Sequence, residues 1–148
     1  NERVGALTIL AGTPDTVEAL TSQVKLRIRS TYSNPPAHGG AIVTTILGDG
    51  TLRKEWEEEL GRMRQRIHDM RRSFVSGLDA LGVSLSSEGN DFLRHQYGMF
   101  SFSGLTQQQV AELRDDHAIY VVGSGRVNFA AMTPDNVPRI CDAIAAVL

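Results

Sequence analysis

The order of apolar and polar positions predicts a first part of the chain made mainly of helices. Val4–Ala11 (VGALTILA) is apolar without alternation, which is typical of a strand buried on both faces. Thr13 and Pro14 then indicate a helix start, because threonine caps helices and proline suits the first turn. Asn34–Pro36 ends that helix, since a residue before proline is driven from helical angles. The apolar residues on one face of this helix are Val17, Leu20, Val24 and Ile28.

A short helix is predicted over 37–47, and the longest predicted element follows it. In this long helix the apolar residues recur every three or four positions, and Gly82 suits its C-terminal end. Charged residues occupy most of the other positions. The apolar stripe consists of Leu52, Trp56, Leu60, Met63, Ile67, Met70, Phe74, Leu78 and Leu81.

Beyond Gly82 the pattern changes to short elements. Strands are predicted over 99–103, 119–122 and 126–130, with Gly123–Gly125 as the turn between the last two. A helix capped by Thr106 is predicted over 106–115, and a last helix begins at 133–135 and runs to Leu148. This β-α-β-β-α series predicts a small antiparallel sheet covered by helices, an α+β unit.

The predicted strand at Val4–Ala11 has no predicted neighbour in the first part of the chain. A strand buried on both faces cannot satisfy its backbone hydrogen bonds alone, so several neighbouring strands are missing. We therefore expect the chain to be truncated at its N-terminus and to be part of a larger α/β fold.

Composition and charge exclude several classes of protein. The 148 residues are 41% hydrophobic and 22% charged, as in soluble globular domains. A formal net charge of -2 does not favour nucleic-acid binding, and no apolar run is long enough to cross a bilayer. A lone cysteine, Cys141, makes no internal disulfide, which fits a reducing compartment. We expect a cytoplasmic protein with no nucleic-acid or membrane partner.

Few residues suggest chemistry on their own. The four histidines have no metal-ligand spacing, and Cys141 is interpreted as a buried small apolar residue in the last helix. No nucleophile-elbow, phosphate-loop or dinucleotide motif is present. Five arginines of the long helix lie within 62–72, but acidic residues share the helix, so a solvated charged face is favoured over a nucleic-acid helix. The arginines are Arg62, Arg64, Arg66, Arg71 and Arg72, and the acids are Glu55, Glu57, Glu58, Glu59 and Asp69.

Two isolated arginines lie at the ends of predicted elements. Arg29 ends a helix before the proline-rich segment, and Arg126 begins a strand after a glycine turn. A guanidinium pairs with a carboxylate through two parallel hydrogen bonds, so the two arginines could hold the two ends of a dicarboxylate. The simpler interpretations, a helix C-terminal arginine and a turn arginine, stay open on the chemistry alone.

Five motifs spread over the whole chain resemble, in order, the aspartate and aromatic amino acid aminotransferases, which are pyridoxal-phosphate enzymes of fold type I, class I. The resemblance corresponds to the C-terminal third of such an enzyme. It implies residues 1–62 as the incomplete end of the large cofactor domain and 63–148 as the small C-terminal domain. The motifs are NERVG (1–5), YSNPPAHG (32–39), MRQRI (63–67), GMFSFSG (98–104), and SGRVN (124–128) with MTPDN (132–136).

The resemblance implies roles for six residues. Arg3 matches the arginine that holds the phosphate of the cofactor, and Arg126 the one that binds the substrate α-carboxylate. Arg29 matches the arginine that binds the distal carboxylate of aspartate or glutamate and reaches across from the neighbouring subunit of a homodimer. The same crossing loop contains Ser33 and Asn34, and an aromatic position near the substrate matches Phe100.

The catalytic lysine of such enzymes has no match here. Transamination needs a lysine that forms a Schiff base with pyridoxal 5'-phosphate and then moves a proton. Lys25 and Lys54 are the only lysines, and both lie in charged helical segments. We therefore expect no catalytic residue in this chain, with the Schiff-base lysine upstream of Asn1.

Two functional hypotheses remain open. In the first, the chain is the C-terminal portion of an enzyme that moves an amino group between L-aspartate, L-glutamate or an aromatic amino acid and a 2-oxo acid, and the portion alone is inactive. In the second, it is a lysine-less remnant that acts as a non-catalytic folding or interaction module. A third, binding of nucleic acid by the charged helix, is weak because of the acidic residues on the same helix.

Overall fold

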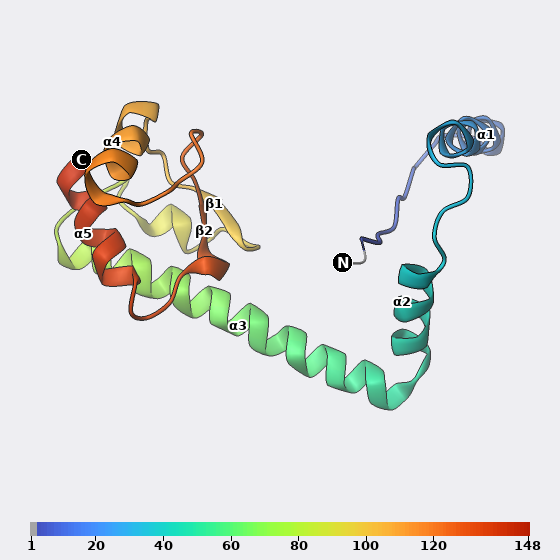
Figure 1. Cartoon of the computed structure of the whole chain (residues 1–148), viewed down its shortest axis with the longest axis horizontal. Coiled ribbons are helices and arrows are strands. Elements are labelled where there is room, and N and C mark those ends of the chain that lie inside the picture. The colour runs from blue at the N-terminus through green and yellow to red at the C-terminus, as the bar shows by residue number, and fades with distance from the viewer. Residues whose placement is uncertain (1–2) are drawn as a thin grey trace. The chain divides into compact units, whose positions relative to one another are not determined.

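The structure is a computed structural model that describes residues 3–148. Asn1 and Glu2, which open the first of the five motifs, lie outside the described residues. The chain forms two compact units, one ending at Glu57 and the other comprising Glu58–Leu148. Figure 1 shows that the first is helical and that the second contains a small sheet.

The predicted strand at Val4–Ala11 is wrong for this structure. The segment forms neither strand nor helix, and nearly all of it is exposed (Figure 1). Leu7 and Ile9 border a hollow of about 350 Å³ together with the apolar face of the first helix. The physical reason is that a strand needs a partner, and no strand of the described residues pairs with this segment.

The two predicted helices of the first unit are confirmed. Helix α1 spans Pro14–Thr31, and Thr13 caps it by accepting a hydrogen bond at 3.3 Å from the Thr16 backbone N–H. Helix α2 spans His38–Gly48. Of residues 3–57, Gly39 alone is buried, so the first unit has almost no core of its own.

The long helix α3 is confirmed over Gly50–Ala80. Asp49 begins it by accepting hydrogen bonds from two first-turn backbone N–H groups, and Gly82 ends it with φ of +70°. The apolar stripe is buried at Phe74 and Leu78, whereas Trp56, Met63 and Leu81 remain 43%, 52% and 47% exposed. Only the C-terminal part of the helix therefore belongs to the core of the second unit.

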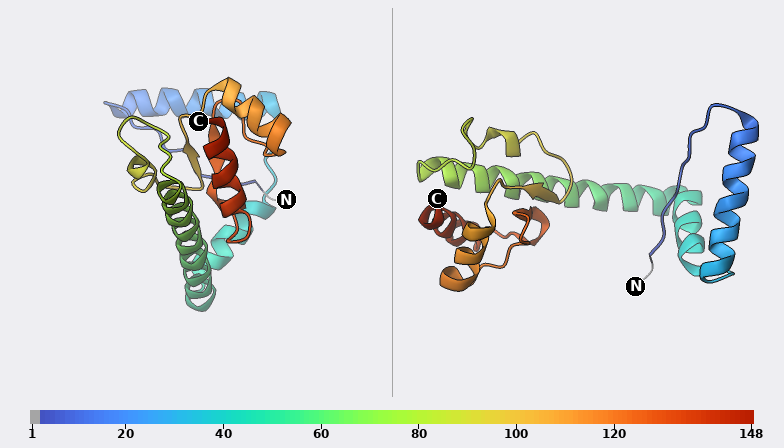
Figure 2. Two further views of the ribbon diagram at one scale, coloured as in Figure 1. Left: turned by 90° about the vertical axis from the view of Figure 1, so that its left-hand side faces the viewer. Right: turned by 90° about the horizontal axis from the view of Figure 1, so that it is seen from above.

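The second unit is a two-stranded antiparallel sheet with helices packed around it. Strand β1 (Phe100–Phe102) pairs with β2 (Arg126–Asn128), and helix α4 (Gln107–His117) packs against α5 (Val137–Val147). Figure 2 shows α4 and α5 on one side of the C-terminal half of α3, with the loop between α3 and β1 on the other. Thr106 caps α4, as predicted, and also forms a complete capping box with Gln109.

Two short elements differ from prediction. The segment 119–122 is not a strand, because Val122 alone forms a bridge, to Arg126, across the tight turn. The last helix begins at Val137 rather than at Thr133, because Pro138 has no N–H to donate to the Pro134 carbonyl and so interrupts the helical hydrogen bonds of that turn. Residues Thr133 and Asn136 bond reciprocally ahead of it: each side-chain oxygen accepts from the other's backbone N–H, at 3.2 and 2.8 Å. The chain between β2 and this turn forms the short 3-10 helix η2 (Phe129–Ala131).

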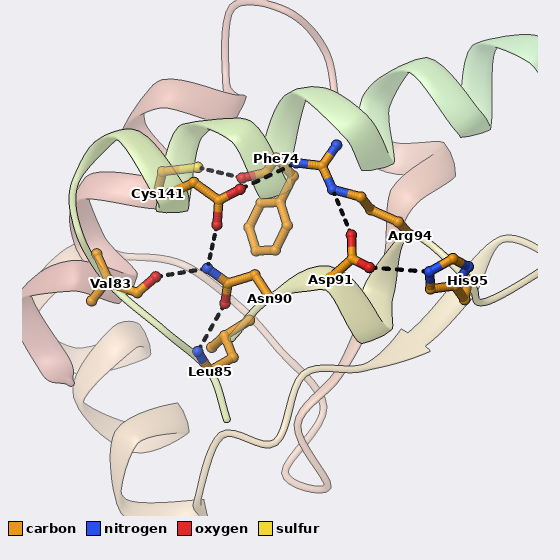
Figure 3. Close-up of polar contacts among 9 residues, drawn as sticks. Phe74, Val83, Leu85, Asn90, Asp91, Arg94, His95 and Cys141 are labelled. Atoms are coloured by element: carbon orange, nitrogen blue, oxygen red, sulfur yellow. Dashed lines mark hydrogen bonds and ion pairs between the residues drawn. The ribbon is translucent and has the colours of Figure 1, made fainter. Parts of the chain in front are cut away.

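The loop between α3 and β1 is held by the buried amide of Asn90 (Figure 3). This side chain donates to Asp79 and to the Val83 carbonyl at 2.9 and 2.7 Å, and it accepts from the Leu85 N–H at 2.9 Å. Arg94, which follows the short 3-10 helix η1 (Asp91–Leu93), adds ion pairs to Asp79 and Asp91. The chain is therefore firmly positioned before it enters β1.

Candidate functional site

The register of the two strands places the predicted substrate residues on one face. Phe100 pairs with Asn128 and Phe102 with Arg126. All four side chains are on the exposed face of the two-stranded sheet of β1 and β2, called the ribbon below. Arg126 lies diagonally across from Phe100, with its guanidinium carbon 4.7 Å from the centre of that ring. Diagonal neighbours in a sheet are within reach of long side chains, and a cation over an aromatic face is attracted to it.

The turn before Arg126 depends on glycine. Gly125 has φ of +73°, and a Cβ there would lie 2.8 Å from the Leu105 carbonyl oxygen. Its N–H donates to the Val122 carbonyl at 2.8 Å, and its carbonyl accepts from the buried Ser103 hydroxyl at 2.7 Å. This packing determines where the strand carrying Arg126 begins.

A hollow of about 320 Å³ opens beside this pair. The ribbon contributes Phe100, Arg126 and Asn128, and the opposite side is formed by 119–122 and by Ile140 and Ile144 of α5. Among the described residues that line it, Arg126 carries the one formal charge. A cation beside apolar walls is suited to an organic anion, because the walls exclude water and strengthen the ion pair.

The other predicted site residues lie in the first unit and are described separately. Arg29 is exposed in the last turn of α1, where it borders a hollow of about 450 Å³ with Lys25 and Glu18. Ser33 and Asn34 lie just beyond the end of this helix and are exposed, and Ser33 has φ of +61°. A left-handed conformation at a non-glycine residue costs about 1–2 kcal/mol.

Arg3 is exposed in the segment before α1. Both lysines are exposed on helices: Lys25 on α1 and Lys54 on α3. An arginine fits a phosphate group, whereas neither lysine has the buried, desolvated setting that makes an amine nucleophilic. The donor set of the described residues therefore fits the phosphate of a phosphorylated cofactor but not its covalent attachment.

The prediction of a solvated charged face on α3 is wrong at Arg71, which is 1% exposed. Arg66 is exposed, and its guanidinium also donates to the carbonyls of Ala130 and Met132 at 3.0 and 2.7 Å. The spacing contained a signal for Arg71, since it lies four residues after Ile67 and three before Phe74, within the apolar stripe.

The remaining candidate residues have structural surroundings. Cys141 is 1% exposed and lies 3.5 Å from the Phe74 carbonyl, and burial raises the pKa of its thiol to about 11. The prediction of a buried small residue is confirmed. Within residues 3–148 no group of His, Cys, Asp and Glu is arranged to hold a metal. None of the helices described there is long and apolar enough to span a bilayer.

Comparison with known proteins assigns the chain to a family. The profile of the aminotransferase class I and II family matches residues 1–144. The chain is 53% identical over all of its 148 residues to the aspartate aminotransferase of Escherichia coli (strain K12). It is 42% identical over 146 residues to the aromatic-amino-acid aminotransferase of Pseudomonas aeruginosa. It spans 37% and 36% of the lengths of these relatives.

Solved structures agree with this assignment. The aromatic-amino-acid aminotransferase from Burkholderia pseudomallei, covalently bound to pyridoxal phosphate, superposes on 94% of this chain with a TM-score of 0.80 at 45% identity, using 34% of its own length. The cytoplasmic aspartate aminotransferase of Saccharomyces cerevisiae covers 96% of the chain with a TM-score of 0.78 at 39% identity, using 34% of its own length. The chain belongs to the aminotransferase class I and II family, and its fold is part of the α/β fold of that family.

Proposed function

We propose that the whole protein transfers an amino group between L-aspartate, L-glutamate or an aromatic amino acid and a 2-oxo acid. The observation that carries this proposal is the Arg126–Phe100 pair, which presents a guanidinium on an exposed face beside a mainly apolar hollow. Both aspartate and aromatic-amino-acid aminotransferases are among the relatives. In this function Arg126 binds the α-carboxylate that every amino acid carries.

Arg29 is proposed to bind the distal carboxylate of aspartate or glutamate. Arg29 lies in the last turn of α1, and the loop after this helix contains Ser33 in a left-handed conformation, followed by Asn34. This supports a loop with one defined backbone conformation. Backbone strain of this kind is concentrated at functional sites. We propose that this loop serves the partner's site in a homodimer.

The cofactor is proposed to be pyridoxal 5'-phosphate, which withdraws electrons from the substrate Cα when bound. Of the described residues, Arg3 is proposed to hold its phosphate, as the guanidinium chemistry allows. We place residues 1–62 in the large cofactor domain and 63–148 in the small domain. The whole protein is expected in the cytoplasm, with no nucleic-acid or membrane partner.

The test replaces the two arginines in the whole protein and compares aspartate with phenylalanine. Loss of a charge-assisted hydrogen bond costs about 2–3 kcal/mol, so we expect Arg126→Ala to lower kcat/KM by roughly 30- to 150-fold for both substrates. Arg29→Ala is expected to do so for aspartate alone. Arg27→Ala is the matched control, because Arg27 is exposed on the same helix. Equal losses for both substrates in Arg29→Ala would contradict its assignment, and no transaminase activity in the whole protein would favour the non-catalytic module.

A further inference from the structure

Arg71 is a buried cation directly beneath the ribbon that carries Arg126. Its Nη2 donates to the Gly98 carbonyl at 2.7 Å and lies 3.5 Å from the Ser101 hydroxyl oxygen. Its guanidinium carbon is 4.8 Å from the centre of the Phe129 ring. Gly98 precedes β1 and Phe129 follows β2, so one side chain of α3 contacts the chain where it enters β1 and where it leaves β2, at the same end of the ribbon.

The burial of this guanidinium is energetically unfavourable by itself. Nε and Nη1 of Arg71 are buried and have no hydrogen-bond partner among the described residues. Desolvation lowers the pKa of the group, and no carboxylate of the described residues forms an ion pair with it. An apolar side chain of similar length would avoid these costs, so stability alone does not explain an arginine here.

The contacts of Arg71 complete a support for the ribbon at both ends. At the turn, Gly125 is held by the buried Ser103 hydroxyl, at 2.7 Å. At the other end, Arg71 donates a hydrogen bond to the carbonyl of Gly98, which precedes β1 and has φ of +81°. The ribbon is two strands of three residues, too short to hold its own geometry. The supports act on its buried face, whereas the Arg126–Phe100 pair is on the opposite face.

We propose that Arg71 is a positioning residue that holds β1 and β2 in the register and tilt that place Phe100 beneath the Arg126 guanidinium. This inference rests on the proposed function, because it assigns Arg71 an effect on the binding of the α-carboxylate. Arg71 does not touch the substrate and acts through the ribbon. A misplacement of about 1 Å can cost roughly two orders of magnitude in rate, so a small shift of the ribbon has a measurable effect.

The variants for the test are Arg71→Met and Arg71→Lys in the whole protein. Methionine fills much of the same volume without charge or donors. Lysine keeps the charge and one donor for the Gly98 carbonyl but loses the planar fork. Arg72→Met is the matched control, because Arg72 is the next residue of α3, is exposed and pairs with Asp69 at the surface. The readouts are KM and kcat for aspartate and phenylalanine, and the thermal midpoint.

Positioning predicts a rise in KM of about tenfold for both substrates in Arg71→Met, with a smaller change in kcat, partial recovery in Arg71→Lys and no change in Arg72→Met. In an Arg126→Ala background the same Arg71→Met change is expected to have no further effect on KM, because the group it positions is absent. A purely structural role predicts a lower thermal midpoint with unchanged KM.

The outcomes separate this inference from the proposed function. A normal KM in Arg126→Ala would overturn the proposed role of Arg126, and the inference with it. A raised KM in Arg126→Ala with a normal KM in Arg71→Met, or full additivity of the two changes, would overturn the inference alone. If Arg71→Met does not fold, Arg71→Lys decides: a KM raised several-fold supports positioning, and an unchanged KM contradicts it.

Discussion

Replacement of Gly125 by alanine tests how the turn before Arg126 is built. Two costs follow from the structure. Alanine at φ of +73° costs about 1–2 kcal/mol relative to glycine. The new Cβ would lie 2.8 Å from the Leu105 carbonyl oxygen and 3.3 Å from the Ser103 hydroxyl oxygen, and backbone shifts of the size needed typically cost a further ~1–3 kcal/mol.

We therefore expect Gly125→Ala to lower the free energy of unfolding of the second unit by about 2–5 kcal/mol. Because the backbone must move next to Arg126, kcat/KM of the whole protein is expected to fall for aspartate and phenylalanine alike. The measurements are urea unfolding followed by circular dichroism, and steady-state kinetics on both substrates.

Gly123 provides a matched control within the same turn. It does not have positive φ, and a Cβ there meets no atom within 4 Å. Gly123→Ala is expected to be neutral or to stabilise by up to about 1 kcal/mol, with normal kinetics. If Gly125→Ala unfolds at the same urea concentration as Gly123→Ala and shows the same KM, the backbone geometry assigned to this turn is wrong.

Two further predictions concern the chain itself. Ala118 ends α4 with φ of +52°, so Ala118→Gly is expected to stabilise the protein by about 1 kcal/mol in urea unfolding. Ala111→Gly, within the same helix, is expected to destabilise it by a similar amount. A loss of stability in both variants would contradict the left-handed cap. Incubation of the chain with pyridoxal phosphate followed by borohydride reduction is expected to leave no stoichiometric adduct on Lys25 or Lys54. Both are exposed and lack the desolvated setting that makes an amine nucleophilic. A site-specific adduct found by peptide mapping, together with turnover of aspartate, would show that the chain is a complete enzyme.

Helix boundaries were largely predictable because their signals are local. Thr13 and Thr106 cap helices through hydrogen bonds within one turn, and Gly82 supplies a left-handed residue where the long helix ends. Such interactions involve residues close in sequence, so they form whatever the rest of the protein does. The Thr133 start was predicted too early, because Pro138 lacks the N–H that would bond the Pro134 carbonyl and continue the helix back to Thr133.

The candidate site could be predicted residue by residue through the resemblance, but its geometry could not. The proximity of Arg126 and Phe100 arises from the strand register, which joins positions 26 residues apart in the sequence. That register is enforced by packing at Gly125 and at Arg71, which involve backbone atoms of distant segments. A sequence pattern contains no information on such distances.

The sequence by itself determined the helices, the caps and the family, since these depend on local spacing and on motif identity. Tertiary structure decided the exposure of Val4–Ala11 and the burial of Arg71, both of which were predicted wrongly from the sequence. Val4–Ala11 has the composition of a buried strand yet is mostly exposed, because strand formation requires a partner outside the segment. Arg71 is of a residue type that usually lies at the surface, yet it is buried, because the ribbon packs over its part of α3. Burial is a property of what lies against a residue, and that is settled only when distant segments meet.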